Sequence, residues 1–296
     1  MPGAGTERAQ VAPELDHVLR EKAAKLRERI ASLGSLGVAF SGGVDSTLLL
    51  AVSFEVLGPE RVVALTAHSE LIPEVERNRA AQIAQQLGVR HIVVELSVLD
   101  DPDISANRPD RCYHCKYAVF TRLKEQALAA GMAGLVHGAN MDDVGDYRPG
   151  ALAAEELGVR APLQEAGFTK ADVRALSRAM GLPTWDLPSM ACLASRVPYE
   201  TPLNADVLAR IDAAEGFLRE RFALRQLRVR DHFPLARIEV PAQEDLERLV
   251  QWDAREAIVS RLQALGYRYV TLDLQGFRSG SMNEVSEIEV LWTSGK

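Results

Sequence analysis

The chain has 296 residues, of which 47% are hydrophobic and 25% charged, so it can bury a full hydrophobic core and is expected to divide into one large and one smaller domain. Its formal net charge of -7 offers no basic surface for a long polyanion, which argues against a nucleic-acid partner. Residues 1–10 contain no signal-peptide core, and no apolar run approaches the roughly 20 residues that span a bilayer, so we expect a cytoplasmic protein without a membrane segment.

The first two thirds of the chain alternate helix and strand patterns. Apolar residues at helical spacing, closed mostly by glycines, predict helices over residues 13–33, 47–57, 73–87, 115–130 and 169–180. Short apolar runs predict strands over residues 36–40, 61–67, 91–96 and 134–138. Strands separated by helices of this length imply right-handed crossovers. The predicted fold is therefore α/β, a Rossmann-like parallel sheet with its ligand crevice at the carboxyl ends of the strands.

The pattern changes in the last third of the chain. Residues 185–202 contain three prolines and little periodicity, which favours a functional loop and a domain junction. Beyond it, helices are predicted over residues 203–221 and 243–265, and strands over residues 227–230, 236–240 and 269–274. We therefore predict a nucleotide-binding domain of residues 1–195 and a smaller α+β domain of residues 196–296 for substrate binding or oligomerisation.

The segment between the first strand and the next helix reads Ser-Gly-Gly-Val-Asp-Ser at residues 41–46. Its glycine amides, hydroxyls and helix amino terminus can surround a phosphate group. It lacks the Gly-Lys-Ser/Thr of a Walker loop and resembles the signature of the PP-loop ATP-pyrophosphatases, which cut ATP between the α and β phosphates. An ordinary glycine turn is the alternative, but a turn alone needs neither the buried strand before it nor the helix after it.

This resemblance implies ATP as a cofactor and Mg²⁺ as its counter-ion. We expect Asp45 to hold Mg²⁺ against the leaving pyrophosphate, because hard cations prefer carboxylate oxygens. The residues predicted to bind ATP are Ala39, Phe40, Ser41, Gly42, Gly43, Val44, Ser46, Thr47, Ala67 and Asn140.

A second polar segment, residues 137–143, follows the strand predicted over residues 134–138. Its side chains are expected to face the same crevice as the first loop, since the carboxyl ends of parallel strands share one edge of the sheet. Asp142 or Asp143 can then join Asp45 on the metal. A solvated helix start is the alternative interpretation of the two aspartates.

Three cysteines, Cys112, Cys115 and Cys192, are an odd number that favours metal or reactive-thiol chemistry over a disulfide framework. The first two are predicted just before a helix, with a basic residue on either side, which favours thiolates. Three thiolates can hold a [4Fe-4S] cluster with one iron left open. The spacing leaves other interpretations open: zinc with His114 as the fourth ligand, a redox dithiol, or an inert buried Cys192.

Several segments together make the chain resemble the LarE family nearly from end to end: residues 41–46, 145–150, 192–196 and 273–284. Proteins of this family are ATP-dependent sulfur transferases that make the nickel-pincer nucleotide cofactor of lactate racemase and related enzymes. The resemblance implies a nucleotide substrate, pyridinium-3,5-biscarboxylic acid mononucleotide, whose carboxylates are adenylated and converted to thiocarboxylates. It also implies sulfide or another sulfur donor as a partner, and assembly into a homo-oligomer.

The resemblance also implies roles for particular residues of the second half of the chain. It places the sulfur-bearing cysteine at Cys192, with Arg196 beside the thiol, phosphate-binding arginines at Arg228 and Arg230, and a polar site residue at Glu239. Arginine forks suit phosphate and carboxylate, and alternate residues of one strand lie on the same face. Without the resemblance, Arg225, Arg228 and Arg230 would be interpreted as a solvated face.

The sequence departs from one branch of the family. Members with a single cysteine are thought to give up its sulfur, whereas the additional Cys112 and Cys115 resemble the cluster-binding branch, in which hydrosulfide on the open iron attacks the adenylate. Two other activities remain as alternatives. A PP-loop tRNA thiolase can carry the same cluster, although the acidic charge argues against it, and an amide-forming synthetase uses ammonia in place of sulfide.

Overall fold

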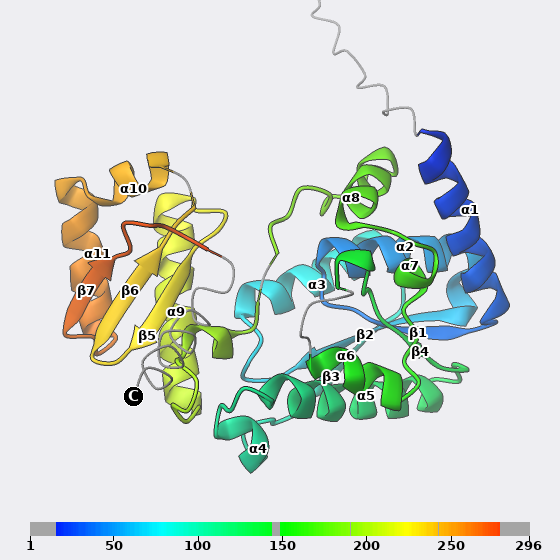
Figure 1. The fold of residues 1–296 in the computed structure, drawn as a ribbon, viewed down its shortest axis with the longest axis horizontal. Coiled ribbons are helices and arrows are strands. Elements are labelled where there is room, and N and C mark those ends of the chain that lie inside the picture. The colour runs from blue at the N-terminus through cyan, green and yellow to red at the C-terminus, as the bar shows by residue number, and fades with distance from the viewer. Residues whose placement is uncertain (1–15, 144–148, 190, 242, 279–296) are drawn as a thin grey trace, which may run out of the picture.

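The computed structural model describes residues 16–143, 149–189, 191–241 and 243–278, and within them it contains two sheets (Figure 1). One is a four-stranded parallel sheet and the other is a three-stranded sheet nearer the carboxyl terminus. The prediction of an α/β fold with a Rossmann-like parallel sheet and a smaller α+β part is confirmed. In this described part of the chain, no helix is both long and apolar enough to cross a bilayer.

The larger part of the fold is built around the parallel sheet. Its strands are β1 (Leu36–Ala39), β2 (Val62–His68), β3 (His91–Glu95) and β4 (Leu135–Val136). Its helices are α1 (His17–Ser32), α2 (Val44–Leu57), α3 (Glu74–Gln86), α4 (Pro102–Ser105), α5 (Arg111–Ala129), α6 (Pro149–Glu156), α7 (Pro162–Glu165) and α8 (Lys170–Ala179), with short turns η1 (Pro59–Arg61), η2 (Met141–Asp143) and η3 (Leu193–Arg196).

The smaller part packs helices on an antiparallel hairpin and a third strand. Its elements are α9 (Ala205–Phe222), β5 (Arg228–His232), β6 (Leu235–Glu239), α10 (Gln243–Leu249), α11 (Trp252–Ala264) and β7 (Tyr269–Leu272). A separate hydrophobic cluster fills it, with Leu218, Val229, Ile238 and Leu262 at its centre. The predicted boundary between residues 195 and 196 stays a prediction.

The strand order of the parallel sheet, β3-β2-β1-β4, locates the expected ligand crevice. The chain runs outward from β1 to β3 and then returns to place β4 on the other side of β1. In doubly wound sheets, ligands bind at the carboxyl ends of the strands where the order reverses. That point lies at the ends of β1 and β4, where residues 41–46 and 137–143 begin.

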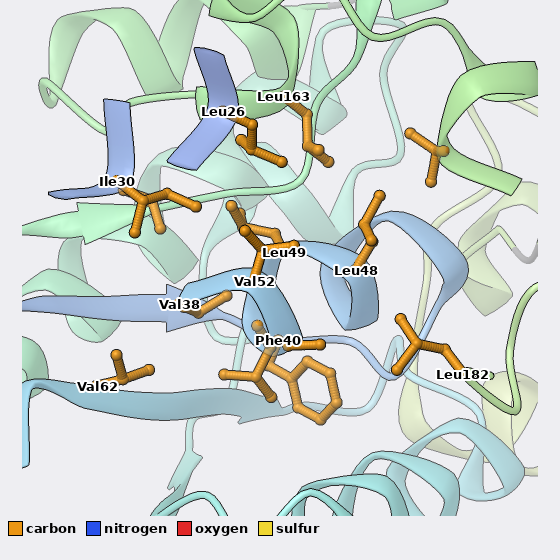
Figure 2. Close-up of a cluster of buried hydrophobic side chains, with 14 of the residues drawn as sticks. Leu26, Ile30, Val38, Phe40, Leu48, Leu49, Val52, Val62, Leu163 and Leu182 are labelled. Carbon is orange, nitrogen blue, oxygen red and sulfur yellow. The ribbon is translucent and has the colours of Figure 1, made fainter. Parts of the chain in front are cut away.

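The helix that follows the predicted phosphate loop is buried on nearly all sides. Figure 2 shows Leu26 and Ile30 of α1 facing Leu49 and Val52 of α2, with Val38 of β1 on the other side of that helix. Each fully buried aliphatic side chain contributes about 1.5–3 kcal/mol. On the opposite face of the sheet, α5 and α6 form the second layer (Figure 1). The start of α2 is therefore held by a packed core.

Two element boundaries differ from the prediction in ways that affect the site. Helix α2 begins at Val44 and not at residue 47, so Asp45 and Ser46 belong to its first turn. Helix α5 begins at Arg111, so Cys112 and Cys115 lie within the helix and not before it. The patterns placed these starts too late because α2 begins inside the glycine-serine motif, which was interpreted as a loop, and α5 begins with polar residues outside the apolar repeat.

The helix predicted over residues 243–265 is in fact two helices, α10 and α11, separated at Val250 and Gln251. The buried positions explain the break. Ala254, Ile258 and Leu262 follow a four-residue repeat, and a continuous helix in phase with them would bury position 250. The break changes the phase so that Leu249 packs in the core, while Val250 is exposed.

Candidate active site

The loop after β1 has a backbone that only glycine accommodates well. Gly42 has a φ of 69°, and a Cβ atom at this residue would lie 2.9 Å from the Cα atom of Ala80 in α3. Gly43 is the N-cap of α2 and leaves the first amides of that helix uncovered by any capping side chain. The Nε of Arg79 in α3 donates to the Gly42 carbonyl at 3.2 Å. The loop is thus fixed from outside and presents a helix amino terminus to an anion.

Two serines close the loop on itself. The hydroxyl oxygens of Ser41 and Ser46 lie 3.1 Å apart, and the Ser41 hydroxyl accepts from the Gly43 amide at 3.3 Å. Val44 and Thr47 are buried behind this turn. Donors and hydroxyls therefore gather at one small cradle, and the chemistry of this donor set fits a phosphate group.

Asp45 joins the phosphate loop to two distant segments. The amide of Asn140 donates from Nδ2 to Asp45 Oδ1 at 3.1 Å, and Asn140 is only 3% exposed. The ammonium of Lys170, at the start of α8, pairs with the other oxygen of Asp45. Gly138 lies so close that a Cβ atom there would sit 2.9 Å from the Ser46 amide nitrogen. The structure therefore brings the predicted Asp45 and Asn140 together at the reversal point of the sheet.

Lys170 is a site residue that the sequence analysis missed. A signal was available, because Lys170 follows the Thr169 cap directly and stands in the first turn of its helix, where the helix dipole disfavours a cation. A charge placed against the dipole indicates a partner elsewhere. That partner is the carboxylate of Asp45.

The two aspartates after β4 hold backbone amides. Asp143 Oδ2 accepts from the Asn140 amide at 2.9 Å, and Asp142 Oδ2 accepts from the Lys170 amide at 3.0 Å. Asp142 thus binds the amino terminus of α8 and lies on the same side of the crevice as Lys170. A magnesium ligand role for Asp142 stays a prediction.

Three of the residues predicted to bind ATP lie at the ends of β1 and β2. Ala39 ends β1, and Ala67 is the next-to-last residue of β2, the neighbouring strand. Phe40 is buried, and its carbonyl accepts from the Thr66 hydroxyl at 2.7 Å. Ala39 and Ala67 thus lie on neighbouring strands at the same edge of the sheet as the phosphate loop.

A cleft of about 1360 Å³ lies above the carboxyl ends of β2 and β3, between α3 and α9. Neither Asp45 nor Cys192 lines it. It adjoins both through their neighbours, because its walls include Arg79, which touches the phosphate loop, and Leu193, the residue after Cys192. The cleft therefore connects the two chemically distinct halves of the site.

The three cysteines come from two segments that meet. Cys112 and Cys115 lie in the first turns of α5, Cys192 precedes η3, and all three are half-buried free thiols. Cys115 and Cys192 pack against the same hydrophobic cluster, around Leu71. Burial raises the pKa of Cys115 to about 12, and the neighbouring Cys192 adds to the effect.

This neighbourhood bears on the predicted metal. In the ranges that the structure describes, no three His, Cys, Asp or Glu side chains are arranged to hold a metal ion. His114, the candidate zinc ligand, has its Nε2 3.4 Å from Asp110 Oδ2. Cys115 and Cys192 share one hydrophobic surrounding, Cys112 lies one helical turn before Cys115, and the cluster stays a proposal.

Arg196 holds the backbone of the cysteine loop. Its guanidinium is fully buried and pairs with both oxygens of Glu215 in α9, at 2.8 and 3.0 Å. It also donates to the Cys192 carbonyl at 3.0 Å. Burial alone would raise the pKa of Glu215, but the Arg196 cation outweighs it and holds that pKa at about 2.

Arg228 and Arg230 are buried, so the interpretation of these arginines as a solvated face is wrong. Arg230 donates to the Ser195 carbonyl at 2.8 Å and pairs with Glu239 Oε2 at 2.7 Å. Arg228 donates to the Ser189 carbonyl at 3.3 Å. Burial and the Arg196 charge lower the pKa of Arg228 to about 10. The structure thus brings both arginines to the loop that carries Cys192.

A glycine-serine cradle at the reversal point of a parallel sheet, with an aspartate in its first helical turn, defines an α/β nucleotide-binding protein of the PP-loop class. The NAD synthase family profile matches residues 18–107, which contain this cradle. An NH₃-dependent NAD⁺ synthetase of Hyperthermus butylicus is 31% identical over 159 residues, 52% of this chain and 57% of that protein.

Two relatives match far more of the chain. The pyridinium-3,5-bisthiocarboxylic acid mononucleotide synthase of Lactiplantibacillus plantarum is 42% identical over 266 residues, covering 90% of this chain and 95% of that enzyme. An uncharacterised protein of Synechocystis is 42% identical over 269 residues, 90% of this chain and 99% of that protein. The chain belongs to the LarE family, the family of that synthase. Residues 145–148 and 279–284, which also carry the resemblance, lie outside the described residues.

Proposed function

We propose that this protein is an ATP-dependent sulfurtransferase that adenylates the carboxylates of pyridinium-3,5-biscarboxylic acid mononucleotide and converts them to thiocarboxylates. The observation that carries the proposal is the combination of an anion cradle around Asp45 with a buried arginine pair beside the Cys192 loop. The relative whose printed name is that of a bisthiocarboxylic acid mononucleotide synthase supports the choice of substrate.

In the first step, a substrate carboxylate oxygen attacks the α-phosphorus of ATP, the bond to the bridging oxygen breaks, and pyrophosphate leaves. The amides at the start of α2 and the hydroxyls of Ser41 and Ser46 receive the phosphate charge, and Lys170 adds a cation. Asp45, with Asp142 as a second candidate, would hold Mg²⁺, which when bound neutralises charge on the leaving pyrophosphate.

Arg228 and Arg230 would bind the phosphate of the mononucleotide, because a guanidinium forms two parallel hydrogen bonds with such an anion. Glu239 holds Arg230 in place through its ion pair. Both arginines already touch the backbone around Cys192, at Ser189 and Ser195. A substrate anchored there would have its ring near the sulfur chemistry.

In the second step, sulfur attacks the acyl carbon of the adenylate and AMP leaves. Cys112, Cys115 and Cys192 would hold a [4Fe-4S] cluster, which when bound offers an iron site for hydrosulfide from sulfide or another sulfur donor. The alternative source is the Cys192 thiolate itself. Arg196 fixes the Cys192 backbone in either case. We also propose that residues 196–296 form the substrate-binding and oligomerisation domain of a homo-oligomer.

The test separates the two steps. Cys192→Ala should abolish thiocarboxylate formation and still release AMP and pyrophosphate from ATP with the pyridinium dicarboxylate. Asp45→Asn is the matched variant and should lose both reactions. Appearance of ADP and phosphate in place of AMP would overturn the proposal.

The match to the NAD synthase family favours one rival, an amide-forming synthetase. To test this rival, wild-type protein is incubated with the substrate, ATP and ammonia but no sulfide. The proposed sulfurtransferase should yield no amide, whereas an amide-forming synthetase would. A separate measurement decides the sulfur source: iron and acid-labile sulfide in anaerobically purified wild type against Cys112→Ala. If iron and sulfide are negligible in both proteins, the Cys192 thiolate is the source of the transferred sulfur.

A further inference from the structure

Asn107 stands between the two cysteine segments in an unusual conformation. It has a φ of 57°, it is not a glycine, and it is completely buried. Its Nδ2 donates to the carbonyls of Pro198 at 2.8 Å and Thr201 at 3.1 Å, both downstream of Cys192. A left-handed backbone at a non-glycine residue persists only where surrounding contacts require it. Here the required contacts are those with the Cys192 loop.

Arg111 continues the connection to the cysteine pair. One nitrogen of its guanidinium donates to the side-chain oxygen of Asn107 and to the Ala194 carbonyl at 3.4 Å. The other lies 3.6 Å from the sulfur of Cys112. A single buried side chain therefore touches Asn107, the turn after Cys192, and Cys112.

The charge of Arg111 lacks the usual compensation. The guanidinium is 3% exposed, and among the described residues no carboxylate lies within ion-pair distance of it, whereas the equally buried Arg196 and Arg230 have Glu215 and Glu239. A buried cation without a counter-ion is strongly unfavourable. The nearby groups that can carry negative charge are the sulfurs of Cys112, 3.6 Å away, and Cys192, and the phenol of Tyr199, whose ring centroid lies 5.9 Å from the guanidinium carbon.

The backbone reinforces this connection. The Glu200 amide donates to the Asn107 carbonyl at 3.2 Å, and the Leu203 amide donates to the Ser105 carbonyl at 2.7 Å. Residues 105–107 and 200–203 are thereby joined by two backbone hydrogen bonds. The segment before α5 is therefore fastened to the segment after Cys192 through both backbone and side-chain hydrogen bonds.

We propose that Asn107 and Arg111 form a hub that holds the Cys192 loop against Cys112 and Cys115, and that the Arg111 cation balances the negative charge of the assembled sulfur site. Both are positioning residues. The inference rests on the proposed function, in which all three cysteines serve one site, and it adds the residues that bring the remote cysteine to the pair.

Arsenite tests the geometry without iron, because arsenic(III) binds three thiolates in one pyramidal complex. The reduced, metal-free full chain should bind arsenite more tightly than Cys192→Ala does. Asn107→Gly relieves the left-handed backbone and removes the amide contacts, so its arsenite affinity should fall about tenfold for the loss of two or more hydrogen bonds. Asn107→Asp keeps the oxygen that Arg111 contacts and loses both donated bonds, and its affinity should fall likewise.

The cluster reports on the charge. Arg111→Met should lower the reduction potential of the reconstituted cluster, because a removed cation disfavours the added electron, and Arg111→Lys should restore much of it. Arg122→Met, on the exposed side of the same helix, is the matched control and should change neither measurement. If Arg111 had only a structural role, the Arg111→Met and Arg111→Lys variants would have the same cluster reduction potential.

Folding and the proposed function are checked separately. Each variant should keep the wild-type circular dichroism spectrum and release AMP with the pyridinium substrate, because the phosphate loop lies elsewhere. The hub is refuted if Asn107→Gly binds arsenite as tightly as wild type, if Arg111→Met leaves the reduction potential unchanged, or if wild type binds arsenite no better than Cys192→Ala. A wild-type protein that binds arsenite yet never releases AMP would refute the proposed function and leave the hub standing.

Discussion

At the residue scale, Lys170 carries a charge that its own helix disfavours, and it pairs with the aspartate of the phosphate loop. Lys170→Met should lower kcat/KM for ATP by roughly 10- to 100-fold, since hydrogen bonds between charged groups contribute about 1.5–3 kcal/mol. The measurement is pyrophosphate release at varied ATP concentration. The loss should appear with saturating substrate carboxylate as well.

Lys22 provides a closely matched control for that experiment. Its ammonium lies 2.6 Å from Asp172 in the same helix α8, and its side chain is 26% exposed against 27% for Lys170. Lys22→Met should leave the ATP kinetics unchanged, because Asp172 keeps its capping bonds from the Thr169 amide and hydroxyl, at 2.8 and 2.7 Å, without Lys22. Equal losses in the two variants would show that α8 is merely destabilised.

The residues found from sequence and those missed differ in how local their signals are. The cradle at residues 41–46 is written in one hexapeptide between a strand and a helix, so a single stretch of sequence reveals it. Lys170 pairs with Asp45, which is 125 residues away in the sequence, and Arg111 donates to the carbonyl of Ala194, which is 83 residues away. Tertiary contacts of that kind leave little trace in a local pattern.

At the element scale, buried strands were predictable and short helices were not. Strands β1 to β3 match the predicted ranges to within one residue at either end, because each is an apolar run bounded by turn residues. Helices α4, α6 and α7 were missed, since pieces of four to eight residues show too little periodicity. The hub before α5 depends on one of these, α4, which leads into the left-handed Asn107.

The amino terminus of α8 yields a prediction at this scale. Thr169 and Asp172 form a capping box, and the next residue after the cap is Lys170. Thr169→Ala should lower the free energy of unfolding by about 1 kcal/mol and also raise the KM for ATP, because the helix start positions Lys170. Urea unfolding and ATP kinetics measure the two effects.

A second cap tests whether the two effects are linked. Asn204 caps α9 by accepting from the Val207 amide at 2.9 Å, far along the chain from the phosphate loop. Asn204→Ala should cost a similar free energy of unfolding while leaving the KM for ATP unchanged. If Thr169→Ala and Asn204→Ala raise the KM for ATP equally, global destabilisation of the protein explains the result.

At the scale of the whole molecule, net charge and site charge have opposite signs. The chain is acidic overall at -7, yet four arginines, Arg79, Arg196, Arg219 and Arg228, lie near only two carboxylates, Glu76 and Glu215. Composition therefore excludes a long polyanion but says nothing of a small anion bound in a cleft. Only the fold assembles these arginines, because they come from α3, η3, α9 and β5.

Two buried groups, His137 in the larger part of the fold and Glu215 in the smaller part, make the free energy of unfolding depend on acid pH. Burial lowers the pKa of His137, at the end of β4, from 6.5 to about 4, with Lys116 adding to the effect. The unfolded chain then binds a proton that the folded protein does not between these values, so stability falls as the pH drops through this window. For Glu215, the unfolded carboxyl is protonated near 4.5 and the folded one near 2, so its contribution is lost between those lower values.

Urea unfolding measured at a series of pH values should therefore show two separate decreases in the free energy of unfolding, each of up to about 3 kcal/mol. His137→Gln should remove the loss of stability between pH 6.5 and 4 and leave the loss between pH 4.5 and 2 unchanged. Glu215→Gln should do the reverse, although it lowers stability at neutral pH because Arg196 loses its buried partner. A single transition that shifts equally in both variants would mean that the two groups do not titrate independently, since their contributions would then belong to one coupled network.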